Sequence, residues 1–273
     1  MKDIIASYSD AKRKNERFDL WLYHVGRRFS WPVAWAAINL GVSATTVTFI
    51  ATGFVWIGAF LIALGNPVWQ IAGTLFFQLW IIFDCADGTV ARATGTGSKR
   101  GEFADAFGGY SVSLLMFTTM GIAGAREVLD LERLSAGFRI AGATGATVQT
   151  ATVLYAGAIL LAGAAGSLFS LYARLLYQKH LNVFEGDKGA TRPIKPRDDR
   201  SNPLMIAAQN LAANSGFALP LTIVAVTGNL ARYYALFYML VNGGMLVLTV
   251  ARTLSGKRAP ELNIAGPGAG SGT

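Results

Sequence analysis

Charged residues are scarce in this sequence of 273 residues: they make up 15%, against about 25% in an ordinary soluble domain. Hydrophobic residues make up 52%, and the mean hydropathy is +0.40. These values exclude an ordinary water-soluble globule. A single cysteine excludes a disulfide framework and a metal site built from cysteines. The first residues lack the apolar core of a signal peptide, so we expect no cleaved leader.

Positive charge is in excess, with 24 Lys and Arg against 16 Asp and Glu and a net charge of +8. In a soluble protein such an excess suggests a nucleic-acid partner. In an apolar chain it indicates cationic loops kept on the cytoplasmic side of a membrane. We therefore predict a membrane protein with no nucleic-acid partner.

Long apolar stretches predict membrane spans, because a helix needs about 20 apolar residues to cross the hydrocarbon layer. We predict six spans: Val42–Leu64, Val68–Ala91, Ala106–Ala125, Ile140–Ala173, Leu204–Ala231 and Tyr233–Ala251. The fourth stretch could hold a turn at Gly142–Gly145 before one long helix, or a kink. The expected fold is an all-α polytopic membrane protein. It has a single domain over residues 1–262, six spans within 42–254 and a disordered tail over 263–273.

The Lys and Arg residues predict the orientation of these spans. With the N-terminus in the cytoplasm, 20 of the 24 fall on the cytoplasmic side. The four on the opposite side are Arg126, Arg133, Arg139 and Arg232. Both termini are therefore expected in the cytoplasm.

An amphipathic segment precedes the first span, within residues 1–32. Phe18, Trp21, Leu22 and Val25 recur at helical spacing among charged residues. This pattern is typical of a helix that lies in the membrane interface with its apolar face in lipid. A helix packed on the cytoplasmic ends of the spans is the alternative.

Acidic residues at membrane depth are costly and are therefore candidates for function. Four lie within or at the edge of the predicted spans: Asp84, Asp87, Glu102 and Asp105. Asp84 and Asp87 share one helical face, and the glycines of the turn 94–101 let the chain return with Asp105. Three carboxylates that converge in a low dielectric repel one another, and a divalent cation relieves this repulsion. Hard oxygen ligands suit Mg²⁺, Mn²⁺ or Ca²⁺.

The sequence DCADGTVAR from Asp84 to Arg92 continues, eight residues later, with Gly101 and then Asp105. It resembles the signature D-x2-D-G-x2-A-R-x8-G-x3-D-x3-D of the CDP-alcohol phosphotransferase (CDP-alcohol phosphatidyltransferase) family. Seven of its eight fixed positions match at the same spacing. The signature covers residues 84–109, and the six-span plan with an N-terminal interfacial helix adds a less specific likeness.

The resemblance implies roles for the matching residues. Asp84, Asp87 and Asp105 would be metal ligands for two ions of Mg²⁺ or Mn²⁺, which hold the diphosphate of a CDP-linked donor. Small residues at Gly88, Ala91 and Gly101 would let the cytidine approach the helices. Arg92 would contact the nucleotide or brace the motif.

The sequence differs from the signature at its last position, where Gly109 replaces the aspartate of the family. In the family this aspartate contributes to the metal site and is the proposed base for the acceptor alcohol. Loss of a positioned base costs roughly 10²–10⁴-fold in rate. Glu102, one turn from Asp105, could replace it, or a metal-bound acceptor could lose its proton without a base. A phosphate or phosphonate acceptor would need no base, and a protein that only binds CDP compounds would need none either.

Several cations are candidates to bind a phosphorylated acceptor, because guanidinium and ammonium groups suit phosphate oxygens. Arg174, Lys179 and Arg192 lie at the end of the fourth predicted span and in the loop after it, and Lys99 and Arg100 lie in the turn beside the acidic cluster. A solvated loop that only sets the topology is the simpler reading of the 174–200 segment.

The resemblance implies a membrane-embedded transferase that moves a substituted phosphate from a CDP-linked donor to an acceptor and releases CMP, in phospholipid or polar head-group synthesis. The donor would be CDP-diacylglycerol or another CDP-alcohol, and the acceptor an alcohol, a phosphate or a phosphonate. Relatives are often homodimers. The acidic cluster lies at the cytoplasmic ends of the second and third predicted spans, so we expect the active site to face the cytoplasm. The alternatives are a catalytically impaired CDP-binding pseudoenzyme and a cation-coupled transporter with buried aspartates. Intramembrane prenyl transfer is less compatible, because it uses two aspartate-rich motifs.

Overall fold

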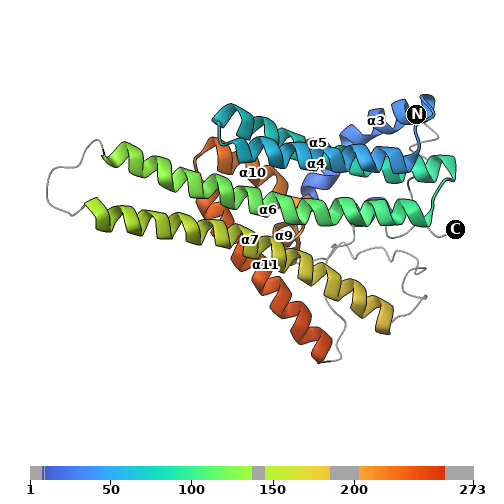
Figure 1. Cartoon of the computed structure of the whole chain (residues 1–273). Coiled ribbons are helices and arrows are strands. Elements are labelled where there is room, and N and C mark those ends of the chain that lie inside the picture. The colour runs from blue at the N-terminus through green and yellow to red at the C-terminus, as the bar shows by residue number, and fades with distance from the viewer. Residues whose placement is uncertain (1–7, 9, 137–144, 185–202, 256–273) are drawn as a thin grey trace.

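The chain forms a bundle of helices, seen in a computed structural model that describes residues 8, 10–136, 145–184 and 203–255 (Figure 1). In chain order these residues form α2 (Asp10–Glu16), η1 (Leu22–Arg27), α3 (Arg28–Asn39), α4 (Ala44–Leu64), α5 (Pro67–Thr94), α6 (Lys99–Ala136), α7 (Gly145–Phe184), α9 (Pro203–Ala212), η2 (Asn214–Ala218), α10 (Leu219–Thr227) and α11 (Ala231–Leu254). No strand occurs among them. The predicted all-α class is confirmed.

Five helices, α4, α5, α6, α7 and α11, are long and apolar enough to cross a membrane. A sixth span is counted if the bent pair of helices over 206–227 is taken as one. The fourth predicted span is the single long helix α7, and the turn predicted at 142–145 lies largely outside the described residues. The predicted number of spans is therefore confirmed at five to six.

The fifth predicted span is broken, which corrects the expectation of one continuous helix over 204–231. The two halves meet at an angle of 70°. Ala213 is extended, with φ −81° and ψ 132°, and Gly216 also leaves helical geometry. A side chain at Gly216 would collide with the carbonyl oxygen of Asn210. Pro220, in the first turn of α10, lacks the N–H that would continue a helix backwards.

Residues at both ends of α5 determine where this helix begins and where it turns toward α6. Asn66 caps its start by accepting a hydrogen bond from the backbone N–H of Val68 at 2.9 Å, and Pro67 follows as a preorganised first residue. Gly95 ends the helix in the left-handed region at φ +64°. The polar motif at 84–92 therefore lies in the last three turns of α5, next to the start of α6.

Two close helix crossings depend on glycine. Between α4 and α5, a Cβ at Gly58 would lie 2.7 Å from the Gly73 carbonyl oxygen. Between α6 and α7, a Cβ at Gly163 would lie 2.6 Å from Cα of Gly121. Figure 1 shows α6 and α7 side by side, extending beyond α4 and α5 at one end. Small residues at such contacts let helices approach closely in a membrane.

Apolar side chains fill the interior of the bundle and also cover its outer surface. Buried side chains from α4, α5, α6 and α11, among them Ile62, Phe77, Met116 and Tyr238, form one continuous core. Many other large apolar side chains are exposed on the spans, including Leu161, which is 70% exposed. Contiguous exposed apolar surface on a monomer marks an interaction site or a membrane. Lipid is the environment that suits this outer surface.

The apolar face predicted for lipid before the first span packs partly against the protein. Leu22 is buried in the core, and Trp21 packs beside it and donates a hydrogen bond from Nε1 to Gln78 Oε1 at 2.9 Å. Gly26 permits this approach, because a Cβ there would lie 3.1 Å from Ile81. Leu22 therefore packs on the spans, as in the alternative, whereas Trp21 is half-buried and packs there in part. Lipid contact by the rest of this face stays a prediction.

We predict that Gly163→Ala lowers stability by about 1–3 kcal/mol, because the added methyl group must separate the backbones of α6 and α7. Gly157→Ala on the same helix is the matched control, since nothing lies within 4 Å of its added Cβ. Thermal unfolding of both variants in detergent measures the difference. Equal midpoints for the two variants would contradict the close contact.

Candidate metal centre and nucleotide cleft

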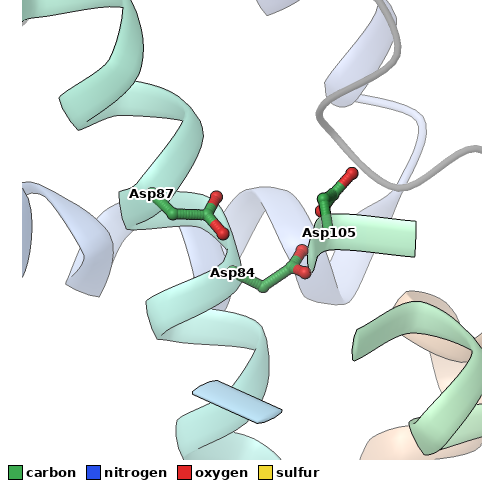
Figure 2. A group of neighbouring side chains, drawn as sticks. All are labelled: Asp84, Asp87 and Asp105. Carbon is green, nitrogen blue, oxygen red and sulfur yellow. The ribbon is translucent and has the colours of Figure 1, made fainter. Parts of the chain in front are cut away.

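Three aspartates converge where α5 ends and α6 begins. One carboxylate oxygen of each of Asp84, Asp87 and Asp105 lies within 4.8 Å of the others. Figure 2 shows Asp84 and Asp87 leaving one helix and Asp105 approaching from the other. Asp84 and Asp87 are 3% and 6% exposed, and Asp105 is half-buried. The predicted convergence of the three side chains is confirmed.

The three carboxylates fit a hard divalent cation. Mg²⁺ binds oxygen at about 2.0–2.1 Å, so two oxygens on opposite sides of one ion are about 4.2 Å apart. Small rotations bring oxygens that lie within 4.8 Å to that separation. Buried carboxylates are costly unless they are paired or coordinate a metal, and an ion at this position would compensate all three.

Asp87 is oriented by groups on two helices. Thr48 on α4 donates a hydrogen bond to Asp87 Oδ2 at 2.6 Å, and the backbone N–H of Gly88 donates to Oδ1. Outer partners of this kind fix the direction of a metal-binding carboxylate. The hydroxyl of Thr48 therefore belongs to the site, although it has no place in the signature.

A cleft opens beside the aspartates. Helix α4 lines it with Ala44, Thr45 and Thr48, helix α5 with Asp87, Gly88, Ala91 and Arg92, and the following segment with Thr96, Gly97, Ser98, Gly101, Glu102 and Asp105. All four residues predicted to contact the CDP moiety thus line one cleft. The predicted substitute base Glu102 is exposed and lines it too.

Comparison with known proteins decides the family. The family model described as CDP-alcohol phosphatidyltransferase matches residues 42–183, just over half of the chain. The chain belongs to this family. No curated protein and no solved structure matches it.

Family membership makes the coarse chemistry plain. CDP-alcohol phosphatidyltransferases carry out CDP-alcohol phosphotransfer in lipid synthesis within membranes, and the family is metal-dependent in general. The matched segment begins just before α4 and ends near the end of α7, so it includes the three aspartates and every residue that lines the cleft. The segment before residue 42 lies outside the match.

Arg174 borders the position where the signature of CDP-alcohol phosphatidyltransferases has its last aspartate. Its Nη1 lies 3.7 Å from the point that a Cβ at Gly109 would occupy. Arg174 is 9% exposed on α7. The space that Gly109 leaves therefore faces a guanidinium.

The other predicted acceptor cations have different outcomes. Lys99 and Arg100 are exposed at the start of α6 and do not line the cleft. Arg192 and the side chain of Lys179 lie outside the described residues. Of the three candidates whose side chains the structure describes, Arg174 is the one that borders the Gly109 position.

Sequence reasoning missed the threonines of α4. Thr45, Thr48 and Thr52 share one face of an otherwise apolar helix, and Thr48 meets Asp87. Polar residues at helical spacing in a membrane span were the signal that could have found them.

We predict that Asp87→Asn abolishes Mn²⁺ binding and that Thr48→Val weakens it by about 10–100-fold, the usual effect of removing an outer partner. Thr52→Val is the matched control, because Thr52 donates to the carbonyl oxygen of Thr48 on its own helix. Titration of Mn²⁺ into the purified protein, followed by electron paramagnetic resonance, measures the affinities. Equal Mn²⁺ affinities for all three variants and the unchanged protein would contradict the site.

Proposed function

We propose that the protein transfers a substituted phosphate from a CDP-linked donor, CDP-diacylglycerol or another CDP-alcohol, to an acceptor and releases CMP. The observation that carries this proposal is the convergence of Asp84, Asp87 and Asp105 beside a cleft lined by the small residues of the signature. The product class is phospholipids or related polar head-group lipids.

The three aspartates are proposed to hold Mg²⁺ or Mn²⁺, two ions by the family resemblance. The bound metal supplies positive charge that neutralises the donor diphosphate, which is the main requirement of phosphoryl transfer. The aspartates fix the position of that charge at the end of α5. Gly88, Ala91 and Gly101 leave room for the cytidine, and Arg92 lies in the cleft to contact the nucleotide.

The transfer forms one bond and breaks one. An acceptor oxygen bonds to the β-phosphorus, and the bond from that phosphorus to the bridging oxygen breaks, so that CMP leaves with this oxygen. An alcohol acceptor must also lose its hydroxyl proton, for which Glu102 is the candidate base in the cleft. A phosphate or phosphonate oxygen is already ionised and has no proton to lose.

An anionic acceptor suits the charges beside Gly109. The signature position carries no carboxylate, and the Arg174 guanidinium borders it instead. A guanidinium keeps its charge at all physiological pH values and binds phosphate oxygens in a planar fork. We therefore propose that Arg174 recognises a phosphate or phosphonate group of the acceptor.

The cleft is proposed to open to the cytoplasm. It lies where α5 ends and α6 begins, beside the turn that Arg92, Lys99 and Arg100 flank, and cations of this kind favour the cytoplasmic side. CDP compounds are soluble there, and a lipid substrate can approach from the bilayer. A homodimer remains a prediction from the resemblance.

We predict that purified protein releases CMP from CDP-diacylglycerol when Mn²⁺ is present, and more rapidly with glycerol 3-phosphate than with glycerol. The two acceptors differ by one phosphate group, which Arg174 would recognise. EDTA should abolish the release. Absence of CMP with both acceptors, although the protein binds Mn²⁺ and CDP, would show a CDP-binding pseudoenzyme instead.

We predict that Gly109→Asp slows CMP release with the anionic acceptor, because the new carboxylate would pair with Arg174 and repel the acceptor. Gly157→Ala is the control, because nothing lies within 4 Å of its added Cβ. Gly108→Ala is unsuitable, because its Cβ would lie 2.9 Å from Thr52 Oγ1. The same CMP assay measures the effect. Faster release with the neutral alcohol after Gly109→Asp would identify a decayed enzyme and contradict the proposed acceptor.

A further inference from the structure

A buried arginine from the N-terminal segment contacts the peptide backbone between two of the aspartates. Arg27 is 3% exposed at the end of η1. Its Nη1 donates to the carbonyl oxygen of Cys85 at 2.9 Å and to Thr89 Oγ1 at 3.1 Å. Cys85 directly follows Asp84 and precedes Asp87 by two residues. The guanidinium therefore hydrogen-bonds to the turn of α5 that carries both carboxylates.

The charge of Arg27 is balanced on its other side. Nε and Nη2 donate to the two carboxylate oxygens of Glu16 at 2.9 and 2.7 Å, in a bidentate pair. The Tyr8 hydroxyl donates to the same carboxylate, and its ring lies 4.9 Å from the guanidinium carbon. Burial raises the pKa of Tyr8, so its hydroxyl keeps the proton that it donates. A bidentate pair between charged groups adds geometric specificity as well as energy.

Thr89 joins this pair to the nucleotide cleft. Its Oγ1 also accepts a hydrogen bond from Arg92 Nη2 at 3.4 Å. The same hydroxyl donates a hydrogen bond to the Cys85 carbonyl oxygen at 2.9 Å. Arg92 lines the cleft, with its Nη1 3.2 Å from the place of a Cβ at Gly88. One hydroxyl thus connects the buried Arg27 to the arginine that faces the substrate space.

We propose that Arg27, oriented by Glu16 and Tyr8, is a positioning residue that sets the Asp84–Asp87 turn and, through Thr89, the direction of the Arg92 side chain. This inference rests on the proposed function, because it assigns a role toward the same metal and CDP. It extends the working site to a segment before residue 42, which the family match does not include.

If the Arg27–Glu16 pair only stabilised the fold, its loss would change the stability of the protein without a separate effect on CDP affinity. Replacing a buried ion pair changes stability by amounts of either sign, so a lower melting temperature alone does not reveal a positioning role. A positioning role requires that CDP affinity changes beyond what a matched loss of stability produces. Thr89→Val provides this test without leaving an unpaired buried charge, because it removes the shared hydroxyl and keeps the side-chain shape.

We expect Thr89→Val to weaken CDP affinity about tenfold at saturating Mn²⁺, in the range for a lost hydrogen bond to a charged group. The matched control is Thr74→Val on the same helix, whose buried hydroxyl donates to the carbonyl oxygen of Ile71. It should leave CDP affinity within about twofold, since it lies about five turns from Arg92. Calorimetric titration of CDP and thermal unfolding are measured for both variants.

The double variant Glu16→Gln/Arg27→Met, in which neither side chain is charged, tests the hydrogen bonds from Arg27 to the α5 turn. We expect it to weaken both Mn²⁺ and CDP binding, because it releases the Cys85 carbonyl oxygen and Thr89 together. Thr89→Val with CDP affinity equal to that of Thr74→Val would overturn the positioning role. Failure of the unchanged protein to bind Mn²⁺ and CDP would instead refute the proposed function, so the two failures are distinguishable.

Discussion

Three carboxylates within 4.8 Å of one another, at the ends of helices that are otherwise apolar, are the constraint on which the rest of the site depends. Their mutual repulsion grows as water is excluded, and it must be offset by cations or by protonation. The Thr48 hydroxyl and the Gly88 N–H donate hydrogen bonds to Asp87, Arg92 lines the cleft with Asp87 and Asp105, and Arg174 borders Gly109. A divalent ion and the charges of a diphosphate complete this balance.

The helices position these charges through caps and close crossings. Gly95 ends α5 one turn after the motif, and the contact between Gly58 and Gly73 holds α4 close enough for Thr48 to reach Asp87. Arg27, from the N-terminal segment, donates a hydrogen bond to the Cys85 carbonyl oxygen in the same turn. The aspartate turn, itself within the family match, thus contacts a segment that precedes the match and another helix within it.

Local patterns predicted most of the architecture. Apolar runs located the spans, and the i, i+3 spacing of Asp84 and Asp87 correctly placed two carboxylates on one helical face. The break at 213–216 was visible as Gly216 and Pro220, but a hydropathy scan over the whole stretch averages such residues out. Contacts between distant residues were beyond reach. Arg27 meets Thr89 across 62 positions, and no periodicity links Gly109 to Arg174.

The anomalous scattering of manganese in crystals grown with CDP tests the metal centre most directly. We expect a manganese peak bounded by the carboxylates of Asp84, Asp87 and Asp105, with the CDP diphosphate beside it and the cytidine in the cleft along Gly88 and Ala91. A manganese peak remote from these carboxylates, or CDP bound in the cleft with no manganese beside them, would contradict the proposed chemistry.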